Sequence, residues 1–204
     1  LPVHQRSDAS LPEFVAAVNA ATGIFITGGN QMRLTVILGS TSLHRALLAA
    51  GKRGVLIAGT SAGAAALGDV MIAYGKNGNM PRQGQAQFST GLGFISGILF
   101  DQHFRQRARM GRLIMAVAAN PAVLGIGVDE NTAALITGSQ VRVIGRNAVT
   151  ILDGATMHSS NISEVLPQSL IAVSGIRYHL LTAGCSFDLE QRNADIPLNL
   201  IPGD

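Results

Sequence analysis

A strand-length apolar run ending in a glycine-flanked serine is the feature that most restricts the fold of this chain. Residues 55–63 read VLIAGTSAG, and a helix-favouring Ala-Ala-Ala-Leu stretch follows directly. A G-x-S-x-G turn between a strand and a helix is typical of a nucleophile elbow, in which Gly59 and Gly63 remove Cβ atoms that would collide. The pattern therefore predicts Ser61 as a nucleophile. A glycine-rich turn with a serine helix cap stays open, because short matches also occur by chance.

Backbone donors are expected around this serine. Ser61 would lie at a helix N-terminus, where free N–H groups and the helix dipole face a developing negative charge, so the N–H of Ala62 is a candidate oxyanion donor. Gly28 and Gly29 follow another short strand pattern and let backbone N–H groups approach a ligand, although an ordinary tight turn is favoured for two glycines alone. Because both loops follow strand ends, we expect them to meet at one edge of a sheet.

The alternation of strand and helix patterns predicts an α/β fold. Strand patterns at 24–27, 55–58, 98–100 and 123–128 alternate with helical stretches, which indicates a mostly parallel, flavodoxin-like sheet with helices on both faces. Short strand patterns at 133–136, 140–144 and 148–152 predict a small antiparallel extension toward the C-terminus. Residues 73–88 are polar and glycine-containing, which predicts a mobile lid. The length of 204 residues fits a single domain.

Two further strand ends carry the groups that a nucleophilic serine needs. His103 follows the 98–100 strand pattern and can serve as the base, although a lone histidine after a strand is more often structural. Asp129 and Glu130 follow the 123–128 pattern, where a carboxylate can orient the imidazole and stabilise its protonated form. We favour Glu130 for that role and expect Asp129 to be a structural or ligand-facing neighbour.

A cluster of arginines follows His103. Arg105, Arg107, Arg109 and Arg112 are predicted on one helix, with Arg105, Arg109 and Arg112 near one face. Guanidinium groups suit carboxylate ligands because their donors are planar and paired. A solvated basic face is an equally good interpretation.

Composition narrows the class of protein. A formal charge of +3 with only 13% charged residues is too diffuse to predict nucleic-acid binding. No apolar run reaches membrane-spanning length, and the first residues do not resemble a signal peptide, so we expect a soluble protein without a membrane partner. The single Cys185 favours a reducing compartment, and the histidines lack zinc-like spacing, so no metal is expected.

Taken together, these motifs resemble the cyanophycinase family of serine peptidases, which are related to peptidase E and have a class I glutamine-amidotransferase-like fold. The matching segments lie between residues 24 and 154, in the family's order: TGGNQMRL from Thr27, AGTSAGAAALGDVMI from Ala58, GLGFISGILFDQHFRQRARMGRL from Gly91, LGIGVDENTA from Leu124 and VIGRNAVTILDG from Val143.

The resemblance implies a Ser61, His103 and Glu130 triad that hydrolyses cyanophycin or a related β-aspartyl peptide to β-Asp-Arg dipeptides, acting as an exopeptidase through an acyl-enzyme. It also implies no cofactor, a homodimer and a cytoplasmic location, with an export signal upstream of Leu1 left open. Asp101, Asp129 and Asp69 are alternative acids for the substrate guanidinium. The implied oxyanion donors are Ala62 with Gly29 or Asn30, and the implied substrate-binding residues are Gln31, Asp101, Gln102, Arg105, Arg107, Arg109, Arg112 and Asp129.

Two departures from the family's pattern qualify this expectation. Asn30 stands where the family usually has an acid, and the family's first βα units have no counterpart before Leu1, so we expect the chain to lack them. The alternatives are a peptidase E-like aspartyl dipeptidase and a non-catalytic homologue that keeps the pocket. An esterase of the α/β-hydrolase kind is disfavoured, because here the histidine precedes the acid.

Overall fold

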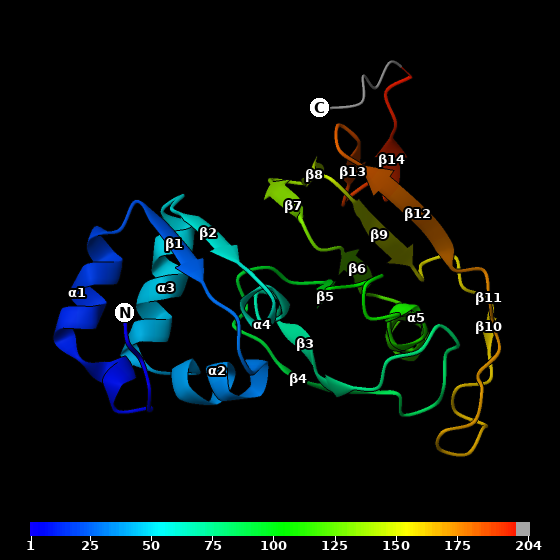
Figure 1. The fold of residues 1–204 in the computed structure, drawn as a ribbon, viewed down its shortest axis with the longest axis horizontal. Coiled ribbons are helices and arrows are strands. Elements are labelled where there is room, and N and C mark those ends of the chain that lie inside the picture. Colours follow the sequence, from blue (N-terminus) through cyan, green and yellow to red (C-terminus); the bar gives the residue numbers. More distant parts are fainter. Residues whose placement is uncertain (199–204) are drawn as a thin grey trace. The chain divides into compact units, whose positions relative to one another are not determined.

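The computed structural model describes residues 1–198, which pack as two compact units. The first unit comprises Leu1–Tyr74 and Phe88–Phe100, and the second comprises Gly75–Gln87 and residues 101 to 198 (Figure 1). The prediction of one domain over residues 1–204 stays a prediction.

The first unit is built on a parallel strand pair. β1 (Gly23–Ile26) and β2 (Leu56–Gly59) pair in register, with Ile24 opposite Ile57. One face of this pair packs against α1 (Pro12–Ala20) and α3 (Ser42–Lys52), which lie side by side in Figure 1. The core there is formed by buried aliphatic side chains, among them Val18, Ile26, Leu38, Leu43, Leu47 and Met71. The remaining helices of this unit are η1 (Asp8–Ser10), α2 (Gln31–Leu38) and α4 (Ala62–Ala65).

The opposite face of the parallel pair is uncovered in the described residues. Phe25 is 64% exposed and Leu56 is 60% exposed. The register places Phe25 opposite Ala58, two residues from Leu56, so both side chains lie on the same face. Within residues 1–198, β1 pairs with β2 alone.

Most of the remaining strands form two four-stranded sheets. One has the strand order β12-β9-β6-β5 and the other the order β14-β13-β8-β7. β10 pairs with β11 in one two-stranded sheet, and β3 pairs with β4 in another. The strands outside the first parallel pair are β3 (Val70–Gly75), β4 (Ala86–Thr90), β5 (Ile98–Gln102), β6 (Leu124–Val128), β7 (Thr132–Thr137), β8 (Gln140–Gly145), β9 (Ala148–Asp153), β10 (Ser159–Ser160), β11 (Val173–Ser174), β12 (Arg177–Thr182), β13 (Ser186–Asp188) and β14 (Asn193–Asp195).

These sheets pack as layers. α5 (Met110–Ala119) covers one face of β6, where a Cβ placed on Gly125 would lie 2.9 Å from Val117 Cγ2. The opposite face of this sheet contacts the second sheet: the ring of His179 on β12 packs edge to face with the ring of Phe187 on β13, with centroids 5.1 Å apart. The β9 side chains between these layers are fully buried, as expected for a strand covered on both faces.

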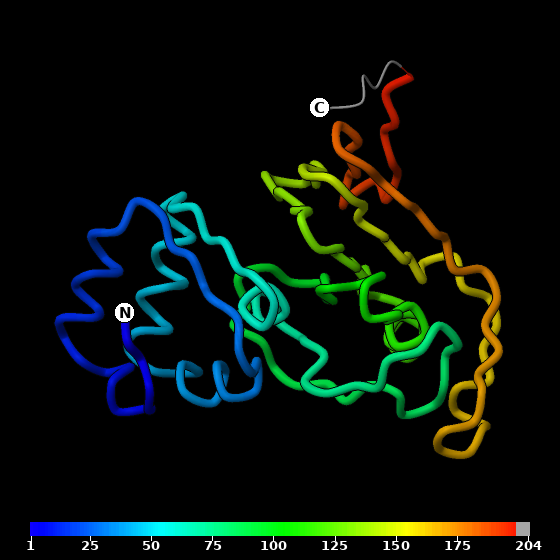
Figure 2. The backbone as a smooth tube through the Cα atoms, viewed as in Figure 1, coloured from blue at the N-terminus to red at the C-terminus, as the bar shows by residue number. Residues whose placement is uncertain are grey.

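The predicted mostly parallel sheet with helices on both faces is wrong. β1 and β2 are parallel, but β6 with β9, β9 with β12, β7 with β8, and β8 with β13 pair antiparallel. Figure 2 shows the reason after β9, where the chain passes through the β10–β11 pair and returns as β12 without a helix between the strands. A parallel connection needs a crossover, usually a helix, whereas short turns reverse the chain. The predicted antiparallel extension is confirmed, and it forms much of the second unit.

Two local predictions are also corrected. The arginine helix begins later than expected, because residues 104–108 form turns and α5 starts at Met110. The predicted lid is anchored: Gln85 is 4% exposed, and the Gly78 N–H donates to Ala108 O at 2.7 Å. Within residues 1–198, no single helix is long and apolar enough to cross a membrane. One bent pair, α2 with α3, has sufficient length and apolar composition when the two helices are taken together, and nothing more is known of it in this respect.

Candidate active site

Ser61 lies in a strained turn between β2 and α4. Its φ of 52° and ψ of −119° are unusual for a residue with a side chain and match the sharp strand-to-helix turn predicted from the sequence. The flanking glycines are required by space, since a Cβ on Gly63 would lie 2.2 Å from Ile26 O and one on Gly59 would lie 2.6 Å from Gly63 C. The elbow geometry predicted for residues 59–63 is therefore confirmed.

The glycine turn after β1 lies against this serine, as predicted. A Cβ on Gly28 would lie 3.1 Å from the Ser61 Cβ, and the Thr60 N–H donates to Ile26 O at 3.0 Å. Gly29 has a φ of 133°, which other residues rarely adopt. Asn30 caps α2 by accepting a hydrogen bond from the Arg33 N–H at 2.9 Å. The three candidate oxyanion donors, Ala62, Gly29 and Asn30, thus come from two turns that meet.

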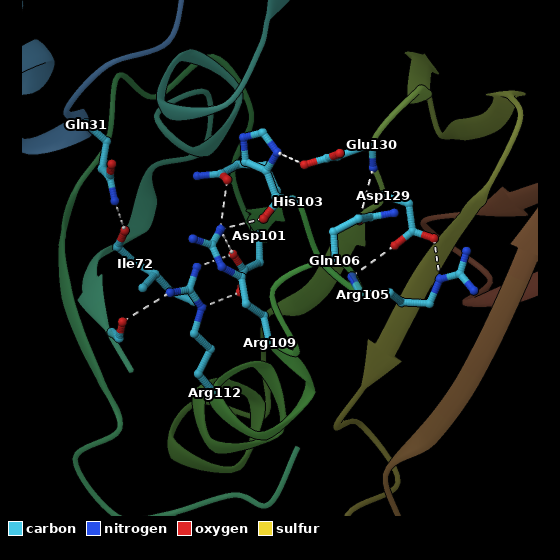
Figure 3. Close-up of polar contacts among 12 residues, drawn as sticks. Gln31, Ile72, Asp101, His103, Arg105, Gln106, Arg109, Arg112, Asp129 and Glu130 are labelled. Carbon is cyan, nitrogen blue, oxygen red and sulfur yellow. Dashed lines mark hydrogen bonds and ion pairs between the residues drawn. The ribbon is translucent and has the colours of Figure 1, made fainter. Parts of the chain in front are cut away.

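A cavity of about 750 Å³ opens beside these turns. Residues 27–30 and Ala62 contribute to its wall, and the rest is formed mainly by apolar residues of β1, of the helices α1, α2 and α3, and of the first residues of the chain. Gln31, a predicted substrate-binding residue, is used within the same unit: its Nε2 donates to Ile72 O at 3.1 Å and to Ala73 O at 2.8 Å (Figure 3). Its amide therefore fastens the start of α2 to β3.

The second unit contains a histidine–carboxylate pair. His103 Nδ1 lies 2.8 Å from Glu130 Oε1, and Figure 3 shows the two side chains pointing toward one another. A carboxylate only accepts, so Nδ1 carries the proton, and in the neutral ring the lone pair lies on Nε2. This is the arrangement of a general base with its orienting acid. Of the two acids at the end of β6, Glu130 makes this contact, as favoured from the sequence.

The backbone around this pair is tightly held. His103 has a φ of 49°, an uncommon conformation for a side-chain-bearing residue. The Glu130 N–H donates to Gln106 Oε1 at 3.2 Å, and Asn147 Nδ2 donates to Glu130 O at 2.8 Å. Gln106 and Asn147 were missed by the sequence reasoning, since isolated amide side chains in turns carry no distinctive spacing.

Asp129 is 3% exposed and supports the same turn. Its Oδ1 accepts from the Arg105 N–H at 3.1 Å, and its Oδ2 accepts from Arg105 Nε and, at 3.2 Å, from the Ala148 N–H. It therefore ties the turn after His103 to the start of β9, which fits its expected role as a structural neighbour.

Asp101 is shared by two buried arginines. Arg112 donates Nε to Asp101 Oδ2 at 2.6 Å and Nη2 to Oδ1, while Arg109 Nη1 donates to Oδ1 at 3.2 Å. Arg109 Nη1 also donates to Gln102 Oε1 at 2.7 Å and to Gln102 O. Burial, opposed by Asp101 and aided by the charge of Arg112, lowers the pKa of Arg109 to about 10, which still leaves it charged at neutral pH.

The four predicted arginines therefore differ in surroundings. Arg109 and Arg112 are buried against Asp101, whereas Arg105 and Arg107 are exposed, with Arg105 held by Asp129. Of the three acids considered for a substrate guanidinium, Asp69 has no arginine partner among the described residues. No group of three or more His, Cys, Asp or Glu side chains in residues 1–198 is arranged to hold a metal ion.

Comparison with known proteins supplies the family. The model of peptidase family S51 matches residues 1–144. The cyanophycinase of Nostoc sp. (strain PCC 7120) is 40% identical over 194 residues, which are 94% of this chain and 65% of that protein, and the cyanophycinase of Geminocystis herdmanii is 39% identical over 90% of this chain and 68% of its own length. The chain thus spans less than two thirds of the Nostoc protein's length.

A solved structure agrees with this assignment. The crystal structure of a peptidase from an acI-B1 Actinobacterium is 30% identical, with a TM-score of 0.63 over 92% of this chain and 68% of that one. Its similarity supports a mixed α/β peptidase fold. The family model and the relatives, which extend over most of the chain, give one conclusion: the chain belongs to peptidase family S51.

Proposed function

We propose that this protein is a serine-type peptidase that hydrolyses cyanophycin. The observation that carries the proposal is the elbow conformation of Ser61, together with the His103–Glu130 pair, in a chain of family S51. Curated relatives at 39–40% identity are named cyanophycinase, which supports the choice of substrate.

In the proposed reaction, His103 removes the proton of Ser61, and Ser61 Oγ attacks a backbone carbonyl of the polymer. The tetrahedral oxyanion is stabilised by the N–H of Ala62 with that of Gly29 or Asn30. His103 then donates its proton to the leaving amine, and water releases β-Asp-Arg from the acyl-enzyme by the reverse proton transfers. Glu130 holds the His103 tautomer throughout. A homodimer and a cytoplasmic location remain predictions.

The test measures dipeptide release from purified cyanophycin by wild-type protein, by Ser61→Ala and by Ser163→Ala. Ser163 is an exposed serine whose hydroxyl donates to its neighbour Glu164, so its variant controls for loss of a hydroxyl elsewhere. We expect release by wild type and Ser163→Ala, and a loss of at least about 1,000-fold in Ser61→Ala.

Equal release by Ser61→Ala would refute the serine mechanism. Cleavage of small aspartyl dipeptides without cleavage of the polymer would redirect the assignment to a peptidase E-like activity. Absence of release from both substrates, with no labelling of Ser61 by a phosphonate probe, would favour a non-catalytic binding protein.

A further inference from the structure

Arg109 is a buried arginine close to the turn that carries His103, and its side chain donates hydrogen bonds to groups of the protein itself. The side chain of Arg109 is 9% exposed, and its Nη1 faces three acceptors: Asp101 Oδ1, Gln102 Oε1 and Gln102 O. Two of these acceptors belong to the residue that directly precedes His103. The guanidinium is therefore already committed to the end of β5.

The backbone on the other side of His103 is fixed as well. The Phe104 N–H donates to Val128 O at 3.2 Å, and the Arg109 N–H donates to Phe104 O at 3.1 Å. Asp129 holds the Arg105 N–H. Between these two anchors, His103 keeps its φ of 49°, which costs free energy and persists only where the surroundings enforce it.

Stability alone does not account for this arrangement. Arg109 Nε is buried without an acceptor among the described residues, and Arg109 lies beside a second buried cation, Arg112, on the same carboxylate. An unpaired buried donor is unfavourable, and buried ion pairs are often no better for stability than apolar packing. The contacts that distinguish Arg109 from Arg112 are those to Gln102.

We propose that Arg109 is a positioning residue for His103: by fixing the carbonyl and amide of Gln102, it sets the direction in which the imidazole leaves the end of β5. Gln102 is the intermediate through which Arg109 acts, and Asp101 holds the guanidinium in place. This role rests on the proposed function, and the substrate contact that the family resemblance implied for Arg109 stays a prediction.

The chain offers a matched control in the same unit. Asp153 is also a fully buried carboxylate shared by two arginines, Arg177 and Arg192. Asp153 pairs with Leu124 at the first residue of β6, whereas Asp129 follows the last residue, so this second cluster lies at the opposite end of the strand. Arg192→Met therefore removes a comparable ion pair without touching the His103 turn.

The experiment compares wild type, Arg109→Met, Arg109→Lys and Arg192→Met in cyanophycin hydrolysis, at a temperature where circular dichroism shows each variant folded. We expect Arg109→Met to lower kcat by about 10- to 100-fold, as a misplaced catalytic group does, with KM within about twofold. Arg109→Lys should recover part of kcat, because an ammonium can still donate to the Gln102 carbonyl. Arg192→Met should keep kcat within about twofold.

A raised KM with unchanged kcat in Arg109→Met would overturn the proposal and favour the substrate-binding role implied by the family resemblance. Unchanged values of both would overturn the proposal as well. A second measurement is independent of turnover: the ¹⁵N-edited signal of the His103 Nδ1–H, assigned by its loss in His103→Gln. We expect this signal to shift or broaden in Arg109→Met and to stay in place in Arg192→Met. If wild type hydrolyses nothing, the proposed function fails, and an unchanged signal in Arg109→Met would refute the positioning role separately.

Discussion

Adding one methyl group to β6 should show that the position of His103 affects the rate separately from the stability of the sheet. Gly127 lies under the ring of Phe104, the residue after His103, and a Cβ at Gly127 would be 2.5 Å from Phe104 Cγ. Ordinary contact begins near 3.4 Å, so in Gly127→Ala the ring must retreat by about 0.9 Å. Phe104 is 1% exposed, so the displacement passes to the backbone of the turn.

Gly125→Ala is the matched control. Gly125 lies two residues away on the same face of β6, and its Cβ would meet Val117 Cγ2 at 2.9 Å and Leu113 Cδ1 at 3.0 Å. These are side-chain ends on α5, they need to move by only about half an ångström, and none belongs to the His103 turn. The two variants therefore add the same methyl group to the same strand, but Gly127→Ala displaces Phe104 whereas Gly125→Ala displaces side chains of α5.

Overpacking of this kind costs about 1–3 kcal/mol, with Gly127→Ala at the upper end and Gly125→Ala at the lower. Urea unfolding followed by circular dichroism measures that cost. Since a shift of about 1 Å in a catalytic group lowers the rate about 100-fold, we expect a loss of that order in kcat for Gly127→Ala and less than about threefold for Gly125→Ala. Equal kcat values per folded molecule in the two variants would refute the claim that Phe104 transmits position to His103.

Two predictions concern pH. Burial raises the pKa of Asp153, but hydrogen bonds from the Ala155 N–H, Arg192 and Arg177 outweigh burial and lower that pKa below its ordinary 3.8. The unfolded chain therefore takes up the proton first, and the stability of the folded protein falls below about pH 3.8. In Asp153→Asn the urea midpoint should depend less on pH in this range, and an unchanged dependence would contradict the prediction. Burial, with the charge of Arg177, lowers the pKa of His179 below its ordinary 6.5, so stability is present above pH 6.5 and declines below it. His179→Gln should remove the decline that begins below pH 6.5, and persistence of the decline in this variant would assign it to another group.

The local geometry of the candidate site was more predictable from the sequence than the arrangement of the strands. Ser61 was identifiable because a sharp turn excludes Cβ atoms at both flanks, and that requirement leaves a glycine pattern in the sequence. His103 and Glu130 were identifiable because polar groups that directly follow buried strands gather at a sheet edge. Of the two acids, Glu130 is the one whose side chain contacts His103, and its catalytic role stays a prediction.

Strand direction was not predictable in the same way. An apolar strand buried on both faces has the same composition whether its neighbours run parallel or antiparallel, and β9 is such a strand. The distinction lies in the connections, and the segment from 154 to 176 contains no helix although its length would allow one. The arginines were misplaced for a related reason: their spacing fits a helix, but the contacts of Arg105 and Arg109 hold residues 104–108 in turns before α5 begins.

The open side of the parallel pair in the first unit has a practical consequence. Phe25 and Leu56 form an apolar surface beside the unpaired backbone edge of β1 within the described residues, and an exposed apolar strand edge is a template for another chain. Any preparation in which this edge stays bare should therefore self-associate as its concentration rises, so a charged substitution such as Phe25→Lys is the first change to make for better solubility in crystallisation and spectroscopy.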